Sequence, residues 1–277
     1  MTELQTRPAC RELRAFVRVY AQREISRTGT VVICPAPPRL EQTLEFQFGE
    51  KICFAHNGGA RQDSPAIMVV GAITEWGAIS LPAGAISFGV FFQPGGFSRI
   101  FGIPMAELSR HAYDATTVLG RLVGSLGDQL AASGSFAERV VIVEQFLLKR
   151  AARLSRSTPI EEATARVFAV KGSVRVGEIA LHYGLGLRQF ERRFLEHTGI
   201  QPKVYARIAR FQSALDAKIS APRRPWLDIA HTLGYHDQMH MVREFHELAG
   251  DAPGKIFSSI GSMRPPANEA AQKNYHS

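Results

Sequence analysis

Three charged side chains share one face of a short stretch at helical spacing. Arg188, Glu191 and Arg192 stand at positions i, i+3 and i+4, whereas Phe190 and Phe194 fall on the opposite side. Arginine can donate two hydrogen bonds to guanine O6 and N7, and glutamate can accept one from cytosine N4. The face therefore has the chemistry to read base sequence in a major groove. The alternative is a solvated helix face.

This stretch belongs to a unit that occurs twice in the second half of the chain. Glu178–Gly184 matches Asp228–Gly234 at an offset of 50 residues, and both keep the pattern acid-Ile-Ala-x-x-x-Gly. After a slip of one residue, an offset of 51 matches three more positions: Phe194 with Phe245, Gly199 with Gly250, and Pro202 with Pro253. A repeated supersecondary unit constrains function more than any single residue does.

Each copy has the residues that a helix-turn-helix needs. Ala180 and Ala230 are small enough for a second helix to pass over them, and the glycine that follows allows a tight turn. An apolar residue, Phe190 or Met241, can then pack back against the first helix. The sequence therefore predicts two helix-turn-helix units.

The second unit offers a less polar face than the first. Gln238, Met239, Val242 and Arg243 occupy the corresponding positions of the second copy. Gln238 and Arg243 can make polar contacts, and the two apolar side chains can meet thymine methyl groups. Whether Arg243 reads a base or holds a phosphate stays open.

Other signals place the neighbouring helices. A capping box at Thr158–Glu161 predicts the start of a helix that Gly172 can end. Apolar residues at i, i+4, i+7 and i+11 predict one long helix that fixes the two units relative to each other: Val204, Ile208, Phe211 and Leu215.

The first half has the patterns of β structure followed by helices. Leu44, Phe46 and Phe48 alternate with polar residues in a strand predicted over 41–54, and Ile86–Phe92 repeats the alternation. An apolar run over 66–73 and Gly- and Pro-containing turns complete the pattern. Two amphipathic helices then follow, with apolar stripes that predict core or dimer contacts: Leu119, Leu122, Val123, Leu126 and Leu130 in the first, and Phe136, Val140, Val143 and Leu147 in the second.

Together these patterns predict an α+β chain of two domains. Residues 1–156 form a β-sandwich or barrel of the cupin type with trailing helices, and residues 157–260 form an all-α domain with two helix-turn-helix units joined by a long helix. The segment 261–277, rich in polar residues and proline, is expected to be disordered.

Composition agrees with a cytoplasmic chain that has a polyanionic partner. The net charge is +8, and no apolar run reaches the roughly 18 residues of a membrane helix. Cys10, Cys34 and Cys53 are widely spaced, which predicts free thiols rather than a disulfide framework.

Catalytic, metal and cofactor sites are not predicted. His56 and His111 lie far apart, without the His-x-His and glutamate cluster of a cupin metal site. His236 and His240, at i and i+4, lack a third ligand, which favours a capping or packing role. No phosphate loop, serine-nucleophile motif or zinc-protease motif occurs.

The second half resembles the AraC/XylS family of bacterial transcription regulators over roughly residues 159–257. The resemblance lies in two groups of residues: Gly234–Gln238, His240, Arg243–Phe245, Gly250, Pro253 and Phe257 in the second unit, and Arg192–Phe194 with Thr198 and Gly199 in the first. It implies that Arg188, Glu191 and Arg192 face bases. Gly186 departs from the Ser or Thr usual at this helix start, which costs roughly a few tenths to 1 kcal/mol of capping.

The resulting hypothesis is a sequence-specific DNA-binding regulator that reads two successive major grooves and is modulated through its first half. Lys203, Arg207 and Arg210 are candidate phosphate contacts, with plain surface charge as the alternative. An unidentified small-molecule effector, a second copy of the chain and RNA polymerase are further hypothetical partners. The competing hypotheses are an enzyme or ligand-binding β domain whose helical half is an appendage, and an interaction module without affinity for DNA.

Overall fold

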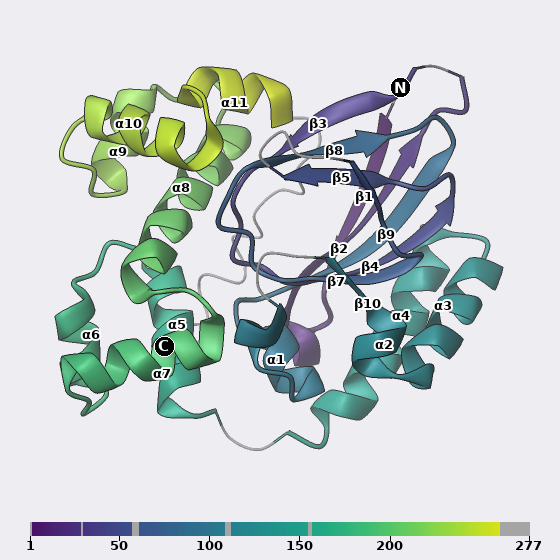
Figure 1. Ribbon diagram of the computed structural model, residues 1–277, viewed down its shortest axis with the longest axis horizontal. Helices are drawn as coiled ribbons and strands as arrows, with labels where there is room; N and C mark the ends of the chain where they lie inside the picture. The colour runs from purple at the N-terminus through teal and green to yellow at the C-terminus, as the bar shows by residue number, and fades with distance from the viewer. Residues whose placement is uncertain (1, 29, 57–60, 109–111, 155–156, 261–277) are drawn as a thin grey trace.

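The computed structural model describes residues 2–28, 30–56, 61–108, 112–154 and 157–260. The tail predicted to be disordered lies outside these residues, and the predicted boundary at 156/157 falls at the edge of an undescribed segment. A β-rich half and a helical half lie side by side, which confirms the predicted fold class (Figure 1).

Two antiparallel sheets form the β-rich half. The larger sheet has the order β1 (Thr2–Pro8), β2 (Val17–Ile25), β9 (Ala85–Phe92), β4 (Thr43–Gly49), β7 (Ile67–Val70) and β10 (Ala112–Asp114). The smaller sheet has the order β3 (Val32–Ala36), β8 (Gly77–Leu81), β5 (Cys53–His56) and β6 (Gln62–Asp63).

The single strand predicted over 41–54 is wrong in its extent. Gly49 has φ +84°, a conformation that suits glycine, and the chain turns there. The residues before the turn pair in the larger sheet as β4, and Cys53 begins β5 in the smaller one. The alternating pattern correctly predicted which face of β4 is buried, because Leu44 and Phe46 are fully buried.

Helices cover the outer face of the larger sheet, where most of the apolar core of this half lies. These helices are α1 (Gly96–Phe101), α2 (Ala115–Leu119), α3 (Arg121–Ala132) and α4 (Phe136–Ala151), with short 3-10 turns η1 (Arg11–Leu13) and η2 (Met105–Leu108). The two predicted amphipathic helices are α3 and α4. Gly120, at φ +78°, separates Leu119 from α3, and Leu122 is 64% exposed, so part of the predicted stripe does not reach the core.

The helical half has the predicted order. Its elements are α5 (Pro159–Ala169), α6 (Val176–His182), α7 (Leu187–Thr198), α8 (Pro202–Ser220), α9 (Trp226–Thr232), α10 (Gln238–Ala249) and α11 (Pro253–Ile260). The capping box at Thr158 is formed, since Glu161 N donates to the threonine hydroxyl while Glu161 Oε2 accepts from Thr158 N. α8 connects the two helix-turn-helix units (Figure 1).

Packing within each unit follows the predicted steric logic. Ala180 and Ala230 are each 1% exposed, and Phe190 and Met241 are fully buried against them in one apolar cluster. The turn glycine of each unit has a positive φ, as the tight turn requires.

The β-rich half also contributes to the core of the helical half. Leu40 and Ala72 are buried in the cluster that α5–α11 build. Among the described residues, no helix is both long enough and apolar enough to cross a membrane.

Candidate nucleic-acid interface

The exposed face of α7 carries most of the residues predicted to read bases in the first unit. Arg188 and Arg192 are exposed, whereas Glu191 is half-buried at the edge of the face. The Arg192 side chain is 67% exposed and lies 3.9 Å from Glu196 in an ion pair that solvent weakens. Both guanidinium groups are therefore available to a ligand that approaches this face.

The exposed face of α10 is built from the equivalent positions 51 residues later. Gln238, Met239 and Arg243 are exposed and Val242 is half-buried. Met239 is 61% exposed, a high value for an apolar side chain, and so presents apolar surface outward. The two faces thus differ in chemistry, as the sequence predicted.

Each face continues one turn further than the sequence analysis proposed. Leu195, 42% exposed, follows Arg192 by three residues, and the exposed His246 follows Arg243 by three. The spacing i, i+4, i+7 from Arg188 or Met239 was the available signal, because these positions share one helix face.

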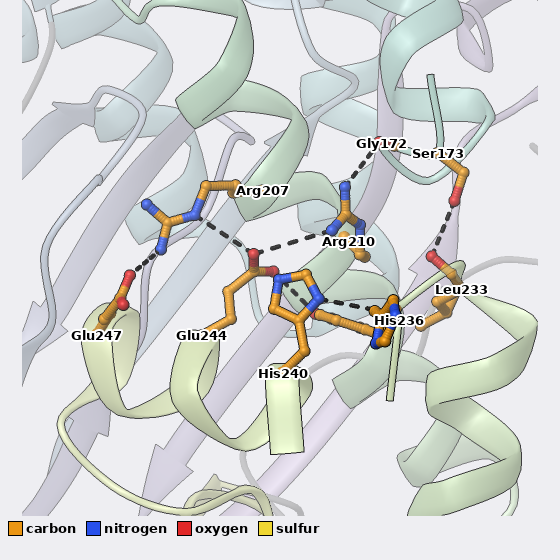
Figure 2. A network of polar contacts seen from close by, with 10 residues as sticks. Gly172, Ser173, Arg207, Arg210, Leu233, His236, His240, Glu244 and Glu247 are labelled. Atoms are coloured by element: carbon orange, nitrogen blue, oxygen red, sulfur yellow. Dashed lines mark hydrogen bonds and ion pairs between the residues drawn. The ribbon is translucent and has the colours of Figure 1, made fainter. Parts of the chain in front are cut away.

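The three candidate phosphate contacts have different surroundings. Lys203 is exposed at the first turn of α8. Arg207 donates from Nε to Glu244 Oε2 over 3.3 Å and also pairs with Glu247, and Arg210 Nη1 lies 3.9 Å from Glu244 Oε2 (Figure 2). Arg207 and Arg210 are therefore more than solvated surface charges, because they neutralise the buried carboxylate of Glu244.

Glu244 is the centre of this polar network, although it lies on α10 and is only 4% exposed. Its Oε1 atom accepts a hydrogen bond of 3.0 Å from the Tyr235 hydroxyl. Burial, followed by the charge of Glu244, raises the pKa of Tyr235 well above its usual range, so the hydroxyl stays protonated and donates. The sequence analysis missed Glu244. Helical spacing shows that this residue faces inward, but it does not show which side chains form ion pairs and hydrogen bonds with its carboxylate.

The same network joins the two units to each other. Arg210 Nη2 donates to Gly172 O over 3.2 Å, in the turn that precedes α6. Ser173 Oγ, in that turn, donates to Leu233 O over 2.8 Å, at the end of α9 (Figure 2). These bonds restrict how the first unit can move relative to the second.

Helices α7 and α10 begin differently. α7 starts at Gly186 without a side-chain cap, as predicted, whereas the Asp237 carboxylate caps α10 by accepting from His240 N. That backbone hydrogen bond, and then the one with the His236 side chain, hold the pKa of Asp237 below its usual range. His240 rests against the Tyr235 ring, in agreement with the predicted packing role.

A second candidate site lies between the two sheets. A cavity of about 140 Å³ has a mostly apolar lining that includes Phe54, Ile79 and Phe91. Its charged lining residues are three arginines and two glutamates: Arg18, Arg23, Arg39, Glu41 and Glu45. Gln212 of α8 and Ile260 of α11 also line it, so both halves of the chain reach this cavity.

Two arginines of the cavity keep a guanidinium donor for an anion, although each of them already pairs with a glutamate. Arg18 is 7% exposed and lies 3.5 Å from Glu41, and Arg39 lies 3.6 Å from Glu45. The Nε atoms of Arg18 and Arg39 are buried without a hydrogen-bond partner among the described residues. Burial lowers the pKa of Arg23, which records the cost of holding its positive charge away from water.

Comparisons with known proteins agree with this architecture. A helix-turn-helix domain family matches residues 179–259, and a domain of unknown function (DUF6597) matches residues 5–114. A comparison with curated protein sequences found no match.

The fold matches solved structures over nearly the whole chain. An apo variant of ToxT from Vibrio cholerae superimposes with a TM-score of 0.53 at 8% identity, covering 91% of this chain and 99% of that one. Wild-type ToxT from the same organism, with an unsaturated fatty acid bound, gives 0.50 at 11% identity, covering 95% and 98%. The AraC-like transcriptional activator CuxR gives a TM-score of only 0.29 at 10% identity, covering 76% of this chain and 86% of that one.

The fold and the two exposed helix faces define the class: a two-domain protein with a double helix-turn-helix. The C-terminal domain is a helix-turn-helix domain of the AraC type, and the chain is a DNA-binding transcriptional regulator. The competing hypothesis of an enzyme with a helical appendage is not favoured, because a helix-turn-helix domain family matches most of that helical half.

Proposed function

We propose that this regulator reads DNA sequence with α7 and α10, each placed in one of two successive major grooves. The observation that carries the proposal is the pair of outward faces at equivalent positions of the two units, held together by α8 and the Glu244 network. Two recognition helices fixed in this way suit grooves one helical turn apart on one side of the duplex.

The residues divide into base-reading and positioning groups. Arg188 and Arg192 suit guanine, and Glu191 at the edge of the face suits a cytosine amino group. In the second unit Met239 and Val242 meet thymine methyl groups, while Gln238 and Arg243 make polar contacts to bases or phosphate. Lys203 holds phosphate. Arg207 and Arg210 contribute positive charge beside it while they remain bound to Glu244.

The test begins with selection of genomic fragments by the purified full-length chain at fixed salt. The selected duplex and a scrambled duplex are then titrated at two salt concentrations. Preference for the selected duplex by about a thousandfold or more supports sequence reading. Equal and steeply salt-dependent binding to both duplexes contradicts it, because phosphate contacts alone give that result.

Arg192→Ala should cost about 1–3 kcal/mol at the selected site and relax preference at one base pair. Arg193→Ala is the matched control, because it removes the same side chain from an exposed neighbouring position that points away from Arg188. Equal losses for the two variants on every sequence would assign Arg192 to phosphate instead.

We further propose that the cavity of the first half binds an effector with an anionic head and a small apolar body. The support is the excess of arginine over glutamate in an apolar lining. ToxT, which shares the fold, has been solved with an unsaturated fatty acid bound. Residues 1–156 are thus the effector domain and residues 157–260 the DNA-binding domain, and the chain acts by binding rather than by turnover.

A second copy of the chain is the proposed partner of α3 and α4. Leu122 and Val141 are 64% and 46% exposed there, and apolar side chains of this size gain from burial between copies. Sedimentation of the wild type and of Leu122→Lys tests the dimer. We expect the wild type to have the mass of a dimer and the variant that of a monomer, and an equal mass for the two would exclude this surface. We further propose that the chain contacts RNA polymerase and acts in the cytoplasm, as suits a regulator of transcription.

A further inference from the structure

One short segment belongs to both the cavity and the DNA-binding domain. Arg39 lines the cavity, and the next residue, Leu40, is fully buried in the apolar core of the helical half. The Leu40 backbone N–H donates to Gln212 Oε1 over 3.0 Å, and Gln212 Nε2 donates to Glu41 Oε2. We call these two hydrogen bonds the Gln212 latch.

Arg18 connects the latch to the interior of the cavity. In the pairing of β2 with β9, Val17 lies opposite Phe92 and Val19 opposite Phe91, so Arg18 is the extra residue of a bulge. A bulge changes the direction of a side chain, and here Arg18 lines the cavity while Val17 stays in the apolar core. Arg18 Nη1 lies 3.5 Å from Glu41 Oε1, and Arg18 Nε has no hydrogen-bond partner among the described residues.

The latch lies among other contacts between the two halves. A Cβ built on Gly250, the C-cap of α10, would lie 3.3 Å from the indole of Trp76. A Cβ built on Gly95 would lie 3.5 Å from His197 Nε2, in the last turn of α7. The C-terminal ends of both reading helices therefore touch the β-rich half, so loosening this interface frees both of them.

We propose that an organic anion in the cavity competes with Glu41 for Arg18 and thereby weakens the Gln212 latch. The inference rests on the effector site proposed above and adds the sign of its coupling. A carboxylate at Arg18 Nε lies close to Glu41 in a medium that screens poorly, so the two like charges repel. Because coupling between two sites is reciprocal, closing the latch also weakens binding of the anion.

Hydrogen exchange of the Leu40 amide measures the latch directly, because this N–H donates to Gln212. Two probes are added to the full-length chain: hexanoate, and hexanol as an uncharged analogue of the same chain length. Hexanoate should speed exchange at Leu40 by about tenfold, within the usual range of allosteric coupling, and hexanol should not. Calorimetry on the same samples establishes whether each probe binds.

Two variants separate the latch from a general effect of charge. Glu41→Gln removes the competing carboxylate and should tighten hexanoate binding while speeding Leu40 exchange without any probe. Glu45→Gln is the control: it also removes a cavity carboxylate, but Glu45 pairs with Arg39 and accepts from Thr43, and among the described contacts it has no hydrogen bond with Gln212. It should tighten hexanoate binding and leave exchange of the unliganded chain unchanged.

The outcomes distinguish the two proposals. If hexanoate binds and exchange at Leu40 is unchanged or slower, the competition is refuted and the effector site stands. If hexanoate fails to bind the wild type and both variants, the effector site itself is refuted, and the competition with it. Neither result bears on the DNA selection, which measures the reading helices separately.

Discussion

Replacing Glu244 by glutamine tests whether buried charge holds the two helix-turn-helix units together. Glutamine keeps the size of the side chain and can still accept from Tyr235, but it loses the negative charge that faces Arg207 and Arg210. Removing one partner of a buried ion pair costs roughly 3–5 kcal/mol. Arg207 is 36% exposed and keeps Glu247, so we expect the free energy of unfolding to fall by about 2–4 kcal/mol.

Glu247→Gln is the matched control for this change. Glu247 binds the same arginine from the same helix, but its side chain is 65% exposed. An exposed ion pair contributes up to about 1 kcal/mol, so this variant should be nearly neutral.

Urea unfolding followed by tryptophan fluorescence measures both variants. Trp226 packs against Phe245, next to Glu244, with ring centroids 5.8 Å apart, and so reports on this domain. A Trp76→Phe background removes the other tryptophan. Equal losses for the two variants, or a loss below about 1 kcal/mol for Glu244→Gln, would refute the assignment of a structural role to the buried charge.

Three further predictions concern the helical half. Gly172→Ala should destabilise it by about 2–5 kcal/mol in the same urea assay, because φ is +69° and the new Cβ would lie 1.9 Å from Ala206 O; Gly177→Ala, in open space, should not destabilise it. Gly186→Ser should stabilise the chain by roughly a few tenths to 1 kcal/mol, since it supplies the missing cap of α7; no gain would indicate that this helix end frays. Burial lowers the pKa of His197, partly offset by Glu161, so the wild type should lose stability as the pH falls below about 6.5, and His197→Gln should lose less; identical pH profiles would contradict this.

The double helix-turn-helix could be predicted from the sequence because its determinants are local. The spacing from Ala180 to the turn glycine and on to Phe190 fixes how two neighbouring helices cross, and the repeat shows the same spacing again. Helix faces follow from the period of 3.6 residues, so the outward positions of α7 and α10 were also within reach. Only their last turn, Leu195 and His246, was left out.

The β-rich half was harder to predict because strand partners lie far apart in the chain. The alternation around Leu44 gave the buried face, but the turn at Gly49 moved the next segment into another sheet. Strands β1, β2, β3 and β8 escaped the sequence analysis. A strand's pairing depends on neighbours that the local pattern does not name.

The sequence by itself determined the two helix-turn-helix units and the residues they present outward, since helical spacing alone decides which side chains share a face. Only the tertiary structure decided where charge is buried. It brought Glu244 to Arg207 and Arg210, turned Arg18 into the cavity at a bulge, and set Gln212 against Leu40 and Glu41. Such contacts join residues up to 172 positions apart, and their energy depends on the exclusion of water, which exists only after both halves have packed.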